Sequence, residues 1–263
     1  MHTRQLIGQL NAIRAQDGKV HTNIYRSLAA LPERDWQCMV SEHTVCIFFY
    51  EGSAQRCQFL TTDLADLVHM LREIPQGITL EIIGRQPEAM AEVLQQGGFQ
   101  QLARMQRWAN RDITSVFAEE SAINNKYGAI NSGGVASLDD ARQILAIYQQ
   151  VFDPRVSHLP ALGELEENIR AGEVVIHKET GCIRTILQRT VEPRRFYIHQ
   201  VYNDGAKAWL HGILLTELRK YYAQGGRYLY AWVQDTNIAS QKMHAKYGMQ
   251  PDGLWAIVYT NAS

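Results

Sequence analysis

The stretch YLYAWVQDTNIASQKMHAKYGM, which spans residues 228–249, decides the fold class of this chain. Tyr228 to Val233 is rich in aromatic and β-branched residues, as a buried strand requires. Asp235 to Asn237 supplies side chains that cap the first turn of a helix, Ile238 to Lys246 favours that helix, and Gly248 ends it. We therefore predict a strand, a loop, a helix and a glycine in this order, and we interpret the rest of the chain as a platform for this unit.

Composition and charge exclude several classes of protein. The chain has 263 residues, of which 46% are hydrophobic and 20% charged, so it can bury one large core or two smaller ones of roughly 100 to 150 residues each. Its formal net charge of −1 provides no basic field, so we expect no nucleic-acid partner. Residues 1–10 lack the apolar run of a signal peptide, and no segment has the roughly 20 apolar residues of a membrane span. These features predict a cytoplasmic protein with no membrane partner.

The cysteines indicate neither a metal site nor a disulfide framework. Cys38, Cys46, Cys57 and Cys182 form no CxxC pair and have no histidine at metal-ligand spacing. We therefore predict reduced, structural thiols and no bound metal.

Turn-forming residues divide the chain into two halves. Residues 111–134 are rich in Asn, Gly and Ser and contain little that builds a core. We therefore predict a first domain at residues 1–113, a linker at 114–136 and a second domain at 137–263. The second domain is expected to contain a helix that Ser137 caps, a helix at 163–171, strands at 174–177, 182–190 and 195–202, a long helix at 207–223, the strand-loop-helix unit and a last strand at 254–260.

The first half contains a gapless copy of the opening stretch. Residues 78–99, ITLEIIGRQPEAMAEVLQQGGF, align with residues 228–249 at an offset of 150 positions, and both segments read strand, helix, glycine, strand. Where the second copy has Asn237 and His244, the first has Pro87 and Leu94. A copy that keeps its apolar positions and lacks these polar ones is interpreted as structural, so we expect the chemistry in the second half.

The second half resembles the GNAT superfamily of acyl-CoA-dependent N-acetyltransferases. The resemblance is carried by the order of elements and by the pattern Asn237-x-x-Ser240-x-x-Met243-His244-x-x-Tyr247-Gly248-Met249, which is similar to the family signature Asn-x-x-Ala-x-x-Leu-Tyr-x-x-x-Gly-Phe. The first half resembles a degenerate copy. The resemblance implies an α/β protein with two mixed-sheet halves in tandem, which transfers an acetyl or other short acyl group from acetyl-CoA or a related thioester to the primary amine of a small molecule or peptide.

The same resemblance implies where the cofactor binds. The strand at 195–202 is expected to diverge from the strand at 228–233, and the pantetheine arm is expected to bond to the backbone in the gap. The helix that follows is expected to bind the pyrophosphate through its N-terminal N–H groups. Trp209 and His211 stand where the family has two glycines, so the CoA site is either distorted or lost. The candidate cofactor-binding residues are Val201, Tyr202, Lys207, Ala208, Trp209, Leu210, His211, Gly212, Asn237 and Ser240.

Three residues are candidates for catalysis. Amide formation from an amine and a thioester needs a deprotonated amine and a thiolate that is protonated as it leaves. His244 stands at the family's tyrosine position and is the candidate acid or hydrogen-bond donor to sulfur, with Tyr247 as a nearby alternative. His199 lies on the strand where the base is expected. Each of the three also has a purely structural interpretation, as a packed or solvent-facing side chain.

Two other functions remain open from the sequence. The altered residues 206–211 favour a non-catalytic binding module for a metabolite or a protein partner. An acyltransferase that uses an aminoacyl-tRNA donor is disfavoured by the absence of net positive charge. The sequence does not define the acceptor amine, the length of the acyl chain or the oligomeric state, and a homo-oligomer is compatible with it.

Overall fold

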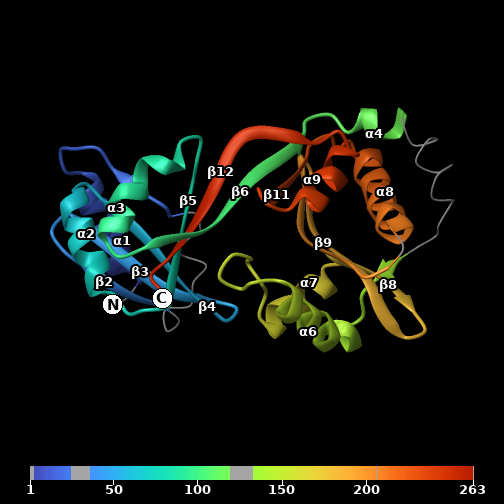
Figure 1. The fold of residues 1–263 in the computed structure, drawn as a ribbon, viewed down its shortest axis with the longest axis horizontal. Coiled ribbons are helices and arrows are strands. Elements are labelled where there is room, and N and C mark those ends of the chain that lie inside the picture. Colours follow the sequence, from blue (N-terminus) through green and yellow to red (C-terminus); the bar gives the residue numbers. More distant parts are fainter. Residues whose placement is uncertain (1–2, 25–35, 119–132, 206, 263) are drawn as a thin grey trace. The chain divides into compact units, whose positions relative to one another are not determined.

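The computed structural model describes residues 3–24, 36–118, 133–205 and 207–262. The chain forms two compact units, which we call unit 1 and unit 2 (Figure 1). Unit 1 contains Met1–Arg104, Phe152–Leu159 and Trp255–Ser263, and unit 2 contains Met105–Val151 and Pro160–Leu254. Both units combine helices with mixed β-sheet, which confirms the predicted α/β class. None of the described helices has the length and apolar character needed to cross a membrane.

Unit 1 buries both faces of its sheet. Its elements are α1 (Thr3–Arg14), β1 (His21–Thr22), β2 (Trp36–Val40), β3 (Thr44–Glu51), β4 (Ala54–Thr61), α2 (Leu64–Glu73), β5 (Ile78–Gly84), η2 (Pro87–Met90), α3 (Ala91–Gln96) and parts of β6 (Gln100–Asn110) and β12 (Gln250–Thr260). The strand order is β2-β3-β4-β5-β12, and only β4 and β5 run parallel. Ile47 and Phe49 of β3 pack with α1, while the alternate residues Cys46 and Phe48 pack with α2 and α3.

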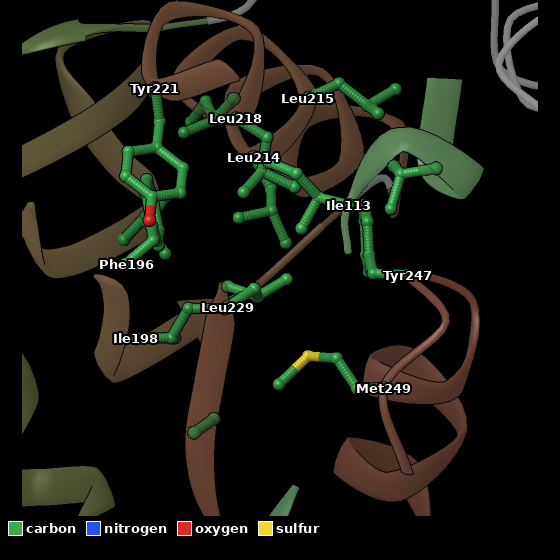
Figure 2. Close-up of a cluster of buried hydrophobic side chains, with 14 of the residues drawn as sticks. Ile113, Phe196, Ile198, Leu214, Leu215, Leu218, Tyr221, Leu229, Tyr247 and Met249 are labelled. Atoms are coloured by element: carbon green, nitrogen blue, oxygen red, sulfur yellow. The ribbon is translucent and has the colours of Figure 1, made fainter. Parts of the chain in front are cut away.

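Unit 2 buries one face of its sheet under a long helix. Its elements are the rest of β6 and β12, α4 (Thr114–Ala118), β7 (Gly134–Val135), η3 (Leu138–Asp140), α6 (Ala141–Val151), α7 (Leu162–Arg170), β8 (Val174–Glu179), β9 (Cys182–Glu192), β10 (Arg195–Asn203), α8 (Lys207–Ala223), β11 (Leu229–Gln234) and α9 (Ile238–Ala245). The strand order is β6-β11-β10-β9-β8-β7, and only β10 and β11 run parallel. Leu214 and Leu218 of α8 lie against Phe196 of β10 and Leu229 of β11 (Figure 2).

The predicted strand-loop-helix unit is confirmed. Strand β11 leads into α9, and the side-chain oxygen of Asn237 accepts a hydrogen bond of 3.0 Å from the Ser240 N–H at the start of the helix. Gly248 has φ of 65°, and a Cβ there would lie 2.8 Å from Nδ2 of Asn110. The copy in unit 1 has the same order of β5, α3 and a glycine, Gly98, with φ of 89°.

Each unit is completed by a strand from the other half of the sequence. Strand β6 pairs with β11 of unit 2 from Met105 to Asn110, and β12 pairs with β5 of unit 1 from Trp255 to Thr260. The compact units therefore divide the chain differently from the predicted domains at 1–113 and 137–263. Residues 119–132 of the predicted linker lie outside the described residues.

A buried ion cluster holds Phe152–Leu159 within unit 1. The Arg56 guanidinium donates to Glu51 at 3.2 Å and to two backbone carbonyls of this segment at 3.0 and 2.6 Å. The His158 ring contacts the carboxylates of both Glu51 and Glu81. Burial opposes a charge on this ring, but the hydrogen bonds that the ring donates to the two carboxylates, together with their negative charges, outweigh burial and raise the pKa of His158 to about 9. The cluster therefore contains two cations and two anions, and it fixes the loop between α6 and α7.

The strand exchange predicts that neither half of the sequence folds alone. A fragment of residues 1–118 lacks the β12 partner of β5, and a fragment of residues 133–263 lacks the β6 partner of β11, so each exposes an unpaired strand edge. We expect each separate fragment to lack a cooperative urea transition by circular dichroism, and the two co-expressed fragments to purify as one folded complex. A cooperative transition for residues 133–263 alone would contradict this account.

Candidate functional site

The parallel pair of strands in unit 2 separates after three residue pairs. β10 and β11 pair from Phe196–Leu229 to Ile198–Ala231, and no further pair follows although β10 continues to Asn203. A register shift against β9 lies between Ile198 and Val201, which marks a β-bulge at the point of separation. The outer part of β10, with Val201 and Tyr202, therefore pairs with β9 on one side and has no strand partner toward β11 among the described residues. The predicted divergence is confirmed.

His244 is a buried and neutral histidine on α9. Its side chain is 3% exposed, and within the described residues Nδ1 has no hydrogen-bond partner. Burial lowers the pKa of His244 to about 4. At pH 7 only about one molecule in a thousand carries the imidazolium ion, so the ring acts as a neutral hydrogen-bonding group. This state disfavours the expected role as a charged acid and retains the role of a hydrogen-bond donor to sulfur.

Tyr247 and His211 form a polar pair inside the core of unit 2. The Tyr247 side chain is 0% exposed, and its hydroxyl group is hydrogen-bonded to Nδ1 of His211 on α8. Figure 2 shows Tyr247 beside Ile113, among the apolar residues under α8. The His211 ring is 3% exposed and therefore faces the core rather than solvent. At this position only the backbone, and not the side chain, is available to contact a phosphate. The pair fixes the end of α9 against α8.

The first turn of α8 presents an N-terminus without acidic side chains. Lys207 is exposed there, and the helix has no Asp or Glu in its first turn. The Trp209 ring stacks on His177 of β8 at 4.3 Å and lies so close to Gly205 that a Cβ at Gly205 would approach it to 2.6 Å. His211 therefore points into the core, whereas the Trp209 ring packs against Gly205, just before the N-terminus of α8. Ala208 and Gly212 are half-buried and Leu210 is buried, while Ala206 lies outside the described residues.

His199 occupies the bulge of β10, on the sheet face opposite α8. Its neighbours Phe196 and Ile198 are buried under α8, so the alternate residue Tyr197 points to the other face. The Tyr197 ring lies 3.9 Å from the His199 ring and stacks on Tyr230 at 4.6 Å. Nε2 of His199 lies 2.8 Å from the hydroxyl oxygen of Thr190. The candidate base is therefore half-buried in an aromatic and polar setting, whereas the capping residue Asn237 is exposed.

The corresponding gap in unit 1 is closed by the protein itself. β4 and β5 pair only at Gln55–Ile78 and Arg56–Thr79, and beyond this point β1 pairs with β4 instead. Asn23, which is 7% exposed, follows β1. Its Nδ2 donates to the Cys57 carbonyl at 3.2 Å and to the Glu81 carbonyl at 3.1 Å, and its Oδ1 accepts from the Phe59 N–H at 2.6 Å. This chain segment occupies the space between the separated strands.

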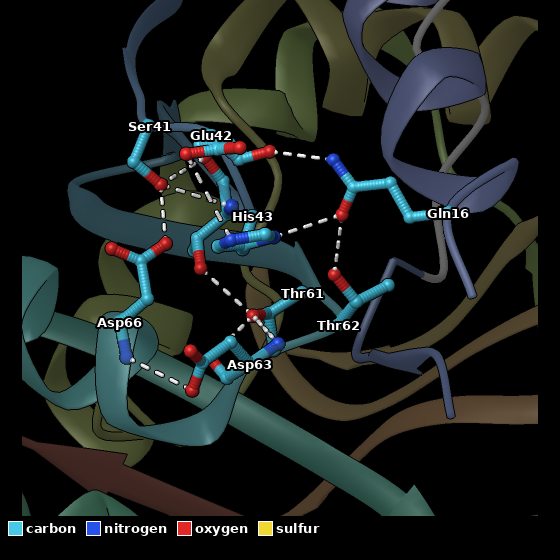
Figure 3. Close-up of polar contacts among 9 residues, drawn as sticks. Gln16, Ser41, Glu42, His43, Thr61, Thr62, Asp63 and Asp66 are labelled. Carbon is cyan, nitrogen blue, oxygen red and sulfur yellow. Dashed lines mark hydrogen bonds and ion pairs between the residues drawn. The ribbon is translucent and has the colours of Figure 1, made fainter. Parts of the chain in front are cut away.

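The helix N-terminus after this gap in unit 1 is also occupied. The Asp63 carboxylate accepts hydrogen bonds of 2.8 and 3.4 Å from the first N–H groups of α2, and a second carboxylate, Asp66, lies in the first turn (Figure 3). Asp66 in turn accepts a hydrogen bond from Ser41. Two negative charges at this helix N-terminus repel a phosphate, in contrast to the first turn of α8. Sequence comparison of the two halves did not identify either feature of unit 1.

Comparison with solved structures identifies the fold. The chain superimposes on a tandem GNAT protein from the clavulanic acid biosynthesis pathway with a TM-score of 0.56 at 12% identity, over 99% of this chain and 96% of the other. The fold is that of a tandem GNAT protein. A GCN5-related N-acetyltransferase from Sphaerobacter thermophilus matches this GNAT fold with a TM-score of 0.54 at 11% identity, over 99% and 92% of the two chains. The sequence matches no protein-family model and no curated protein.

The self-closed gap predicts a large stability contribution from Asn23. Asn23→Ala removes three buried hydrogen bonds and leaves the backbone carbonyls of Cys57 and Glu81 without this donor. We expect the free energy of unfolding to fall by about 2 to 4 kcal/mol in urea melts. Asn11→Ala on the exposed side of α1 is the matched control and should change it by less than about 0.5 kcal/mol. Equal effects of the two substitutions would show that Asn23 does not hold the gap closed.

The buried state of His244 predicts a loss of stability in acid. The folded chain holds this pKa at about 4, whereas the ordinary value is 6.5. Above pH 6.5 the ring is neutral in both states; as the pH falls from 6.5 to 4, the unfolded chain binds a proton that the folded chain does not. Between pH 7.0 and 4.5 we expect wild-type protein to lose about 2 to 3 kcal/mol more than His244→Phe in urea melts. His69→Gln, on the exposed side of α2, is the control and should lose as much stability as wild type. Equal losses of unfolding free energy in wild type and His244→Phe would refute the assignment.

Proposed function

We propose that unit 2 is an N-acyltransferase that moves an acetyl or other short acyl group from acyl-CoA to the primary amine of a small molecule or peptide. The observation that carries the proposal is the gap beside outer β10, where Val201 and Tyr202 have no strand partner toward β11 among the described residues. Unpaired backbone in such a position calls for a partner with its own amide groups, which the pantetheine arm of CoA possesses.

Unit 1 supports this interpretation from within the same chain. There, the separated strand β4 takes β1 as its partner on the side that β5 has left, through His21–Thr61 and Thr22–Leu60. The protein thus demonstrates that an extended chain with amide groups fits such a gap. We assign the corresponding place in unit 2 to the acyl donor and regard unit 1 as structural.

The first turn of α8 is the proposed pyrophosphate site. Its N–H groups and the exposed Lys207 favour an anion, its first turn holds no acidic residue, and Asp204 just before it is paired with Arg184 at 3.0 Å. His211 points into the core, whereas the Trp209 ring packs against Gly205 and His177 beside this turn, so a phosphate would bind the N–H groups next to that ring. Asn237 and Ser240 at the start of α9 remain candidate contacts for the remainder of CoA.

The proposed chemistry divides between two histidines. His199 is the candidate base that accepts a proton from the attacking amine. His244, which is neutral at pH 7, is the candidate hydrogen-bond donor to the leaving sulfur or the thioester carbonyl. Tyr247 bonds to His211 in the core, so we assign it to the support of α9 rather than to proton transfer.

A non-catalytic binding module is the second candidate. It rests on the altered start of α8, where Trp209 and His211 replace the family's two glycines. The Trp209 ring against Gly205 favours this alternative, whereas His211 points into the core and does not. An aminoacyl-tRNA donor gains no support from a net charge of −1.

Calorimetry with acetyl-CoA and with CoA tests the proposed function. We expect binding of both ligands, and Lys207→Glu should weaken it about tenfold because the reversed charge opposes the pyrophosphate. Lys19→Glu in unit 1 makes the same change in net charge and should leave the affinity unchanged. Absence of binding at millimolar acetyl-CoA would reject the acyltransferase and favour the binding module.

A further inference from the structure

Asn110 is the last residue of β6, and its side chain binds the backbone just after α9. The side chain is 7% exposed, and its Nδ2 group donates a hydrogen bond of 2.8 Å to the backbone carbonyl of Tyr247. Its Oδ1 atom accepts a hydrogen bond of 2.9 Å from the Asp112 N–H. Because the carbonyl only accepts and the N–H only donates, the two bonds define the orientation of the carboxamide. Asn110 therefore satisfies a carbonyl group beyond the last turn of α9, where the helix itself offers no donor.

Gly248 leaves the space that this carboxamide occupies. A Cβ at Gly248 would lie 2.8 Å from Nδ2 of Asn110. The backbone of Gly248 also has φ of 65°, a conformation that favours glycine. The glycine that ends α9 therefore permits both the turn and the close contact with β6.

Tyr247 is held at two points, and His244 lies one turn before it in α9. Asn110 binds the Tyr247 carbonyl, and His211 of α8 binds the Tyr247 hydroxyl group. The Tyr247 N–H donates a hydrogen bond of 3.0 Å to the backbone carbonyl of His244. Residues three apart lie on the same face of a helix, and both side chains are buried. A displacement of Tyr247 is therefore transmitted to the ring of His244.

The position of the His244 ring depends on the backbone of α9. Within the described residues Nδ1 of His244 has no hydrogen-bond partner that would hold the ring independently of the helix. The anchor of the helix, Asn110, lies opposite Leu229 at the start of β11, on the strand that the first half of the sequence contributes to unit 2. A residue of the first half thus fixes the helix that carries a candidate functional side chain of the second half.

We propose, on the basis of the acyltransferase function proposed above, that Asn110 is a positioning residue for His244, and that it holds the end of α9 against β6 so that the imidazole ring stays buried beside the reacting thioester. Without the carboxamide, the Tyr247 carbonyl loses its donor and the last turn of α9 moves. Water then reaches the His244 ring, and the hydrogen-bond donor of the reaction is displaced. The first half of the sequence therefore contributes to the reaction through this one side chain, although unit 1 is structural.

Carbon NMR of the full-length chain tests this assignment without a donor or an acceptor substrate. Protein labelled with ¹³C at histidine is titrated from pH 8.0 to 5.0, and the His244 signal is identified by its loss in His244→Phe. In wild type we expect hardly any shift over this range, because burial lowers the pKa of this ring to about 4. In Asn110→Ala, hydration of the ring should raise the midpoint by about one to two pH units, so that a titration becomes visible.

Asn261→Ala is the matched control in unit 1. Asn261 is also 7% exposed, its Oδ1 accepts a hydrogen bond of 2.8 Å from the Ile78 N–H, and its Nδ2 donates one of 2.8 Å to the Pro75 carbonyl. Both alanine substitutions remove the same two kinds of bond, so they should destabilise the chain to a similar extent in urea melts. Only Asn110→Ala should change the His244 titration.

Asn110→Asp decides the question if the alanine variant does not fold. It retains the size of the side chain and the bond from the Asp112 N–H, and it loses only the donation to Tyr247, so it should shift His244 in the same direction. A His244 signal as flat as in wild type in the folded Asn110 variants, or an equal shift in Asn261→Ala, would overturn the proposal. These spectra involve no acyl-CoA, so this failure is distinguishable from failure of the proposed function, which calorimetry with acetyl-CoA reports.

Discussion

The structure depends on the point at which two parallel strands cease to pair. In unit 2, β10 and β11 are joined only from Phe196–Leu229 to Ile198–Ala231, and the bulge that follows turns the outer part of β10 away. The paired portion is fixed by the core under α8, where Phe196 and Ile198 are fully buried. Beyond it, Val201 and Val233 still pack with this core, but the backbone of outer β10 has no strand partner toward β11 among the described residues.

Backbone groups inside a gap of this kind need hydrogen-bond partners, since each buried group without one costs about 1 to 3 kcal/mol. The two units satisfy the same requirement by different means. Unit 1 uses β1 and the Asn23 carboxamide, and Asp63 caps the following helix. Unit 2 has neither a strand in that place among its described residues nor an acidic residue in the first turn of α8. The two halves therefore differ in which gap the chain fills with its own residues.

Local features of the fold were predictable from the sequence, and long-range ones were not. Asn237 and Gly248 mark the ends of α9 because capping and positive φ are requirements of single residues. The exchange of β6 and β12 was not predictable, since the apolar residues of a strand indicate that it is buried but not which sheet it joins. The burial of Asn23 and its role in the gap were not predictable either, because a polar residue near the N-terminus is ordinarily expected to be exposed.

The histidines show that the ionisation and hydrogen bonding of a side chain depend on its surroundings and cannot be inferred from its position in a motif. His211 is buried and finds the Tyr247 hydroxyl group, so it stabilises the contact between α8 and α9. His244 is equally buried and has no partner at Nδ1 within the described residues, so it remains neutral down to about pH 4. His199 is half-buried, and Thr190 fixes its orientation. Two histidines of the same unit therefore differ in ionisation and in hydrogen bonding, and neither difference is visible in the sequence pattern.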